Sequence, residues 1–463
     1  MNTVQKLYLV LLFWSYWLAL AGQGTGGGVV ATGQDDFDAY IKLLMDQNPE
    51  IAAARIDQRI AEQTLAAAGL ERRPTVNLVG DYTAAIGGRT IAFPVGDLFN
   101  PIGGALNQLT SSQDFPTNLE NVDELLAPNN FYDVRFEARL PIIAPAIKRQ
   151  ELLREAELSG SQAAIDVAEL GAETRLRTLY FGFLRTFAGE RVIDSSRLVL
   201  QELLRVNQSL VRNELATSDV VYRTEAELAD LDGQLASLLA QRMTAQAAVN
   251  RLLNRSLGSQ LRNDFAPLDF DTTLAAQNLE SLLGLAQNRP ELDQVDAGLN
   301  TLSALDELQA ADGLPTLGVG VLAGSQGFFG TSYDDDLYAI GNLNLTWNLY
   351  DGSRRNTQRQ ITRLRREAQA TRRDGIARDL ELQIFSTYQN RLAAQARLRA
   401  SASARRSSLR TLELVEAQYR NEQAILVEYL DARNRWTQSE LEYVDAYYEL
   451  LIAHYELLAA IGG

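Results

Sequence analysis

The chain has 463 residues, 46% of them hydrophobic, which is enough to bury a large core. It contains no cysteine, so disulfides, thiolate chemistry and a lipid anchor on an N-terminal cysteine are excluded. The net charge of −16 argues against a nucleic-acid surface, which needs concentrated Lys and Arg.

The first segment has the pattern of an export signal. Lys6 precedes an apolar run from Leu7 to Leu20, and Ala19 and Ala21 provide a small-residue cleavage site. A membrane-spanning helix is the alternative, but a run of about 14 residues falls short of the ~20 that a bilayer requires. We therefore expect a signal peptide over 1–21, followed by a flexible linker over 22–34.

The rest of the chain is organised as an internal repeat. The motif N-P-E at 48–50 has a counterpart 241 positions later, R-P-E at 289–291. The motif R-N-E at 212–214 recurs only 208 positions later, at 420–422. The difference between the two offsets indicates an insertion of about 33 residues in the first half, between Gly87 and Asn130. We predict a first repeat over 35–254, a linker over 255–278 and a second repeat over 279–460.

Each repeat reads as a helix, two strands, a long helix, a short break and a closing helix. A long helix of about 66 residues without proline would form a rod of ~100 Å. The closing helix of the second repeat carries a heptad seam, made of Leu441, Val444, Tyr448, Leu451, Tyr455 and Leu458. The predicted fold class is mainly α with a small β part, with helices at 35–70, 147–212, 219–254, 279–312, 354–420 and 426–460.

The strands lie within 75–142 and 316–350 and alternate between apolar and polar residues. The polar positions include Asp133, Arg135, Glu137, Arg139, Asn342 and Asn344. A half-buried sheet of a soluble protein would show the same alternation. Strand lengths of about 8 to 12 residues, the export signal and the aromatic residues Tyr82, Tyr132 and Trp347 favour membrane strands whose polar side chains line a barrel lumen.

Four strands cannot close a barrel, because two free edges would leave unsatisfied backbone groups in lipid. Several copies must therefore share one barrel. Two copies would supply eight strands and three would supply twelve, and only the larger ring leaves an obvious water-filled lumen. We prefer three copies. The insertion between Gly87 and Asn130 is too apolar for a free linker, and we expect it to fold over the outer mouth of this barrel.

From about Asp35 onward the sequence resembles the outer membrane efflux protein family, the TolC-like ducts. The segments that carry the resemblance are N-P-E at 48–50, R-P-T at 73–75, W-N-L-Y-D-G at 347–352 and V-E-Y-L-D-A at 427–432. The resemblance implies a homotrimer, with a twelve-stranded β-barrel in the outer membrane that continues into a twelve-helix coiled-coil α-barrel in the periplasm. It also implies docking on a periplasmic adaptor (membrane fusion) protein and an inner-membrane transporter, in tripartite efflux or type I secretion.

The resemblance further implies a constriction at the periplasmic helix tips, at Tyr419, Glu428 and Asp431, with Asp219 beside the first tip. A basic residue that often lies between them falls on Ala424, which offers no charge for a salt-bridge lock. Glu428 and Asp431 are one helical turn apart, and threefold symmetry would repeat them as six charges that favour cations. Solvated helix-surface residues are the alternative interpretation.

Two other classes of function compete with a passive conduit. The first is an exported coiled-coil scaffold or adaptor protein whose strands form a soluble β-domain. The second is an exported enzyme, but we find no convincing nucleophile, metal cluster or phosphate loop, and the G-x-G-x-x-G at 22–27 follows a signal peptide rather than a strand. We therefore expect a conduit in the outer membrane with no catalytic residue, no metal and no cofactor.

Overall fold

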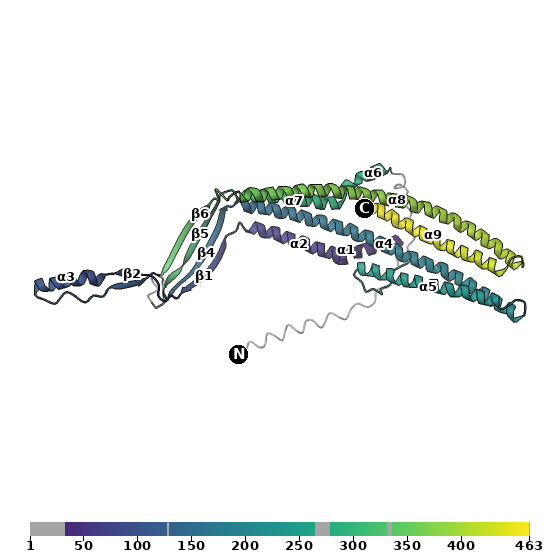
Figure 1. Ribbon diagram of the computed structural model, residues 1–463, viewed down its shortest axis with the longest axis horizontal. Helices are drawn as coiled ribbons and strands as arrows, with labels where there is room; N and C mark the ends of the chain where they lie inside the picture. Colours follow the sequence, from purple (N-terminus) through teal and green to yellow (C-terminus); the bar gives the residue numbers. More distant parts are fainter. Residues whose placement is uncertain (1–32, 127–128, 264–277, 331–335, 463) are drawn as a thin grey trace, which may run out of the picture.

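The computed structural model describes residues 33–126, 129–263, 278–330 and 336–462. The molecule is elongated, with a four-stranded sheet between a bundle of helical rods and a smaller extension (Figure 1). The predicted signal peptide and most of the linker over 22–34 lie outside the described residues, as do residues 264–277 of the linker between the repeats.

The first repeat begins with α1 (Gly33–Gln47) and α2 (Pro49–Leu70), which lead into strand β1 (Thr75–Thr83). The extension follows as β2 (Thr90–Phe93), α3 (Val95–Thr110) and β3 (Val122–Leu125). Strand β4 (Phe131–Ile143) then returns to the long helix α4 (Pro145–Arg212), and α5 (Asp219–Leu252) closes the repeat.

The second repeat has the same order without the extension. It begins with α6 (Leu279–Gly284), the 3₁₀ turn η2 (Leu285–Asn288) and α7 (Pro290–Ala311). Strands β5 (Thr316–Phe328) and β6 (Leu337–Thr346) lead to the long helix α8 (Arg354–Arg420) and then to α9 (Leu426–Ala460). With 68 and 67 residues, α4 and α8 are rods of ~100 Å.

The first helix of each repeat is interrupted, where the sequence predicts one continuous helix. In both repeats the break directly precedes a proline, Pro49 or Pro290, at the first position of the next helix. Proline favours this position because its missing N–H is not needed there, and it restricts the preceding residue to extended backbone. Asn48 and Arg289 are both extended, with ψ of 127° and 136°.

The rods pack along their length, and their core lies on the inward faces of the helices. A cluster at the middle of the bundle joins α1, α4, α5 and α9 around the buried Tyr180, Phe181 and Leu451. A second cluster near the helical tips contains Ile193, Leu200 and Tyr429. Of the predicted heptad seam, Leu451, Tyr448 and Tyr455 lie in the first cluster and Leu441 lies in the second. In the described part of the chain, no helix combines the length and apolarity that crossing a bilayer would require.

The sheet has the order β1-β4-β5-β6 and is antiparallel throughout. Strands β4 and β5 thus join the two repeats at its centre, and β1 and β6 form its edges. The register is continuous except for an irregularity between Pro141 and Ile143, next to the start of α4.

The inserted segment forms a unit of its own, in which β2 pairs with β3 and α3 follows β2. Figure 1 shows this extension projecting away from the sheet along the long axis of the molecule. Our expectation that it folds over the outer mouth of a barrel stays a prediction, since a barrel needs several copies; within one chain the extension points outward from the sheet. The reason is the pairing of β2 with β3, which carries the segment outward before α3 begins.

Candidate functional site

One face of the sheet carries every polar residue assigned to a lumen. The register pairs Asp81 with Asp133, Val79 with Arg135 and Asn77 with Glu137, so odd positions of β1 and β4 share this face. Asn342 lies opposite Gly320 and Asn344 opposite Gly318, and the β4–β5 register pairs these glycines with Arg139 and Pro141. The structure therefore brings the six predicted residues onto one surface.

An ionic network centred on Arg135 holds this polar face together. The Arg135 guanidinium donates to Asp81 at 2.9 Å, to Asp133 at 2.5 Å and to Glu137 at 2.9 Å. Glu137 also accepts from Arg139 at 3.2 Å. The hydroxyl of Tyr338 donates to Asp133 at 2.8 Å and so links β6 to β4 across β5. Asp81 and Tyr338 were not singled out from the sequence, although both stand at polar positions of their strands.

The opposite face of the sheet is apolar and largely exposed. Its pairs include Leu78 with Phe136, Ala138 with Val321 and Val319 with Leu343. Leu343 is 67% exposed, and the other exposed apolar side chains of this face include Val76, Leu78, Tyr82, Val134, Phe136, Val321, Leu337 and Leu345. No helix covers this face in Figure 1. An exposed apolar face of this size marks contact with a membrane or with another protein surface.

The three aromatic residues proposed for a membrane interface have different environments. Tyr82 lies at the outer end of the sheet, and Trp347 follows β6 at the helical end, where its indole N–H donates to Gly313. Both are more than half exposed. Tyr132 differs, because it is buried under Phe329 and its hydroxyl donates to Asp336 at 2.8 Å. Tyr132 thus lies opposite Tyr82 at the same end of the sheet, but it is covered within the chain rather than exposed.

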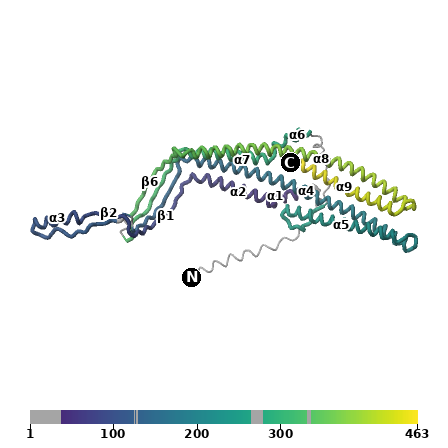
Figure 2. Tube along the Cα trace, viewed as in Figure 1, coloured from purple at the N-terminus to yellow at the C-terminus, as the bar shows by residue number. Residues whose placement is uncertain are grey.

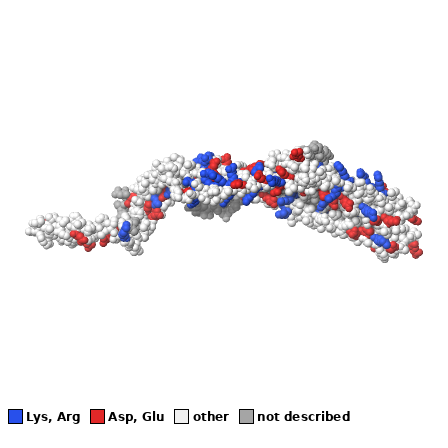
Figure 3. Space-filling model, turned by 45° about the horizontal axis from the view of Figure 1, so that its top comes forward, with Lys and Arg blue, Asp and Glu red and all other residues white. Residues whose placement is uncertain are grey.

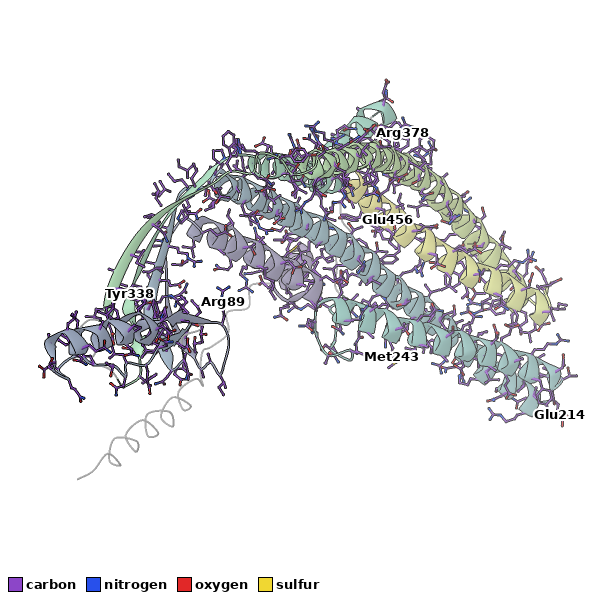
Figure 4. All side chains as sticks on the ribbon, turned by 60° about the vertical axis from the view of Figure 1, so that its left-hand side comes forward. Arg89, Glu214, Met243, Tyr338, Arg378 and Glu456 are labelled. Atoms are coloured by element: carbon purple, nitrogen blue, oxygen red, sulfur yellow. The ribbon has the colours of Figure 1, made fainter. Side chains whose placement is uncertain are left out.

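The opposite end of the molecule consists of two helical hairpins whose tips lie together (Figure 2). Both tips have the same backbone geometry. Glu214 and Glu422 each adopt a φ of 58°, and the next residue donates its N–H back to the helix, from Leu215 to Leu210 and from Gln423 to Gln418. This is the Schellman ending of a helix, here with a glutamate where glycine is usual. Glu214 marks the tip in Figure 4, at the far end from Tyr338.

The predicted constriction residues lie on these tips. Tyr419 is the last residue but one of α8 and stacks on the buried Tyr429 of α9, with ring centroids 5.2 Å apart and planes 9° apart. Burial raises the pKa of the Tyr419 phenol, so this side chain stays neutral at physiological pH. Tyr429 was not singled out from the sequence, although it lies next to Glu428 in the segment that carries the family resemblance.

The three predicted acidic residues are exposed on the tips. Glu428 accepts from the main-chain N–H of Ile425 at 3.3 Å, which places its charge at the N-terminus of α9, where the helix dipole favours it. Asp431 forms an ion pair with Arg435 at 3.1 Å, one turn along α9. Asp219 begins α5, and the hydroxyl of Thr217 donates to it and lowers the pKa of its carboxyl. Arg435 was missed by sequence reasoning, and its charge partly offsets that of Asp431.

Comparison with known proteins supports the architecture. Residues 283–463 match the family model described as outer membrane efflux protein. No match was found among curated protein sequences.

Solved structures resemble the chain over almost all of its length. VceC from Vibrio cholerae superposes with a TM-score of 0.70 at 14% identity, covering 92% of this chain and 96% of that one. CmeC from Campylobacter jejuni gives 0.72 at 13% identity, with coverage of 96% and 90%. The open state of MtrE from Neisseria gonorrhoeae gives 0.70 at 15% identity, with coverage of 92% and 89%. At these identities the likeness concerns the fold. The resemblance to the outer membrane efflux proteins is thereby confirmed: the second repeat matches the family model, and more than nine-tenths of the chain has the fold of the TolC-like outer membrane channels.

Proposed function

We propose that this protein is the exit duct of a tripartite efflux or type I secretion system. Three copies form a twelve-stranded barrel in the outer membrane and a twelve-helix tunnel in the periplasm, and substrates pass through it without any chemical step. The observation that carries the proposal is the four-stranded sheet, which has one exposed apolar face and one polar face joined by salt bridges between its side chains.

The free edges of the sheet explain why several copies are needed. Strands β1 and β6 each have a single neighbour in the chain, so their outer N–H and C=O groups would be unpaired in lipid. Pairing of β6 of one copy with β1 of the next removes both edges. Three copies of a four-stranded sheet then give twelve strands, the size at which a barrel leaves a lumen.

The helical tips are the proposed contact with the energy-supplying partners. A periplasmic adaptor and an inner-membrane transporter would meet the hairpins α4–α5 and α8–α9, whose tips share one geometry. Six equivalent tips would then surround the tunnel entrance. Tyr419, Glu428, Asp431 and Asp219 line this entrance in our proposal, and it opens when the hairpins separate as rigid bodies. The partner proteins can be identified by copurification from the native membrane.

Neighbouring residues of β6 provide a matched test of the lipid face. Leu343→Arg places a charge on the apolar face, where arginine at mid-membrane costs ~2–4 kcal/mol, and we expect failure of membrane assembly. Asn342→Arg places the same charge on the polar face, and we expect stable trimers with altered conductance in planar bilayers.

The competing scaffold function makes the opposite prediction. A soluble β-domain would tolerate both arginines, and the protein would stay monomeric without detergent. That result would overturn the duct. Heat-modifiable trimers on denaturing gels, formed by the wild type and by Asn342→Arg but not by Leu343→Arg, would support it.

A further inference from the structure

The extension beyond the sheet has an unusual distribution of polar and apolar contacts. A polar stripe of α3 packs on the return segment over 112–121. Asn100 exchanges two hydrogen bonds with the main chain of Leu119, at 2.7 and 2.8 Å, and Asn107 does the same with Phe115, at 2.8 and 3.0 Å. The extension is thus held together by polar contacts, and its apolar side chains are left outside.

Two glycines on the same stripe show how closely these parts fit. A Cβ added at Gly96 or Gly103 would collide with the main-chain carbonyl of Leu119 or Pro116. Gly96, Asn100, Gly103 and Asn107 follow one another at intervals of four, three and four residues, which keeps them on one side of α3. This side is therefore fully occupied by the chain itself.

A separate stripe of α3 has the spacing of a coiled-coil seam. Its residues follow at intervals of four, three, four and three, and they are Val95, Phe99, Ile102, Leu106 and Leu109. Leu109 is 82% exposed, and Phe99 and Ile102 are each 53% exposed. The last four residues of the seam together with Leu98 offer on the order of 500 Å² of apolar surface. This is more than half of the ~800 Å² that one partner contributes to a stable interface.

Charge and length argue against lipid as the occupant of this seam. Residues 90–132 contain no Lys, Arg or His, and their acidic residues are Asp97, Asp114, Glu120, Asp123 and Glu124. Such a segment is repelled by anionic headgroups. Figure 3 shows the extension almost without basic atoms. The 16 residues of α3 span ~24 Å, less than the ~30 Å of a hydrocarbon core.

We propose that the α3 helices of three copies pack against one another along this seam and form a three-helix cap beyond the barrel. The inference rests on the proposed trimer, since β1 and β4 of every copy deliver the extension to the same rim. No acidic residue stands on the seam, so the negative charges can remain outside the cap. Substrate then leaves between the three stalks, and the cap restricts the exit.

The chain lacks cysteine, so single cysteines can be introduced without removing others. Ile102→Cys lies on the seam, and Glu120→Cys lies on the exposed return segment as the matched control. In purified trimers treated with a short bis-maleimide, we expect Ile102→Cys to give cross-linked dimers on denaturing gels and Glu120→Cys to give none. Ile102→Asp should keep the trimer and increase single-channel conductance at least twofold, because the cap separates.

The outcomes distinguish this inference from the proposed function. Trimers that conduct ions but yield no cross-link at position 102, with unchanged conductance of Ile102→Asp, overturn the cap and leave the duct intact. Labelling of Ile102→Cys by a photoreactive lipid, or its cross-linking to a different protein, would likewise overturn the cap and leave the duct intact. If neither the wild type nor any variant forms trimers, both the cap and the proposed duct are overturned.

Discussion

The side-chain amide of Asn48 donates to the main-chain carbonyl of Leu252 at 2.9 Å, and this bond joins the start of α2 to the end of α5. The same side chain accepts from the N–H groups of Glu50 and Ile51 and so caps α2. In the second repeat, Arg289 donates to the carbonyl of Ala459 and joins α7 to α9 in the equivalent way. Two short helices are thus fastened end to end beside each long one.

Replacing Asn48 tests this joint. Asn48→Ala removes the cap and leaves the Leu252 carbonyl without its side-chain donor, so we expect a loss of about 2 kcal/mol in stability. Asn48→Asp keeps the cap and loses only the donor, so its stability should lie between that of Asn48→Ala and that of the wild type. The order of the three stabilities can be measured by thermal unfolding, followed by the loss of helical circular dichroism. Equal stability of all three proteins would contradict the joint.

Removing the tip charges tests the constriction. The double variant Glu428→Gln/Asp431→Asn should reduce the preference for cations in planar bilayers severalfold, because a ring of carboxylates attracts cations. Asp230→Asn, on the exposed part of α5 away from the tip, is the matched control and should leave the preference unchanged. If the double variant keeps the cation preference of the wild type, these residues do not form the ring.

A buried polar link between α4 and α9 is expected to keep the tips together. Arg433 donates to the carbonyl of Ser196 at 2.9 Å, and the hydroxyls of Ser196 and Thr437 are 2.8 Å apart. The variant Ser196→Ala/Thr437→Val should loosen the two hairpins and increase the open fraction of single channels. Ser195→Ala is the control, because its hydroxyl bonds only within α4, to the carbonyl of Arg191. A double variant that gates like the wild type would show that the link has no part in opening.

Glu456 on α9 predicts a pH dependence of stability (Figure 4). Burial raises the pKa of this carboxyl, so the folded state binds its proton more tightly than the unfolded chain does. Its stabilising contribution is complete below the ordinary carboxyl pKa of ~4.3 and is lost as the pH rises through the folded value.

At pH 7 we therefore expect Glu456→Gln to raise the melting temperature, and at pH 4 the difference should vanish. Glu62→Gln, at an exposed position of α2, should change the melting temperature neither at pH 7 nor at pH 4. A melting temperature of Glu456→Gln below that of the wild type at pH 7 would instead indicate a cation of a neighbouring copy at this carboxylate.

The sequence predicted the parts of the fold that rest on regular periodicity. The alternation in Phe131–Ile143 placed Asp133 and Arg135 on the polar face, and the proline-free segments predicted α4 and α8 within two residues of their ends. The insertion between Gly87 and Asn130 was located from the sequence, but its helix was not predicted. Pro101 lies inside α3, and a proline at such a position favours a break in a helix.

The contacts of the site were harder to predict than its residues. Arg435 pairs with Asp431 one turn away on α9, whereas Tyr429 of α9 stacks on Tyr419 of α8. A sequence shows that such groups are near one another along the chain, but it does not show that they touch. Tyr132 is buried because Phe329, almost two hundred positions away, lies over it. Contacts of that kind depend on strand register, which fixes every pair at once.

The end-to-end joints also have a mechanical consequence. Each long helix is continuous from the sheet to the tip, whereas its companion is divided at Asn48 or Arg289 into two pieces. A rod that is continuous on one side and divided on the other bends most easily at the division. Sideways motion of the tips can therefore be absorbed halfway along the rods, and the sheet at their other end stays undisturbed.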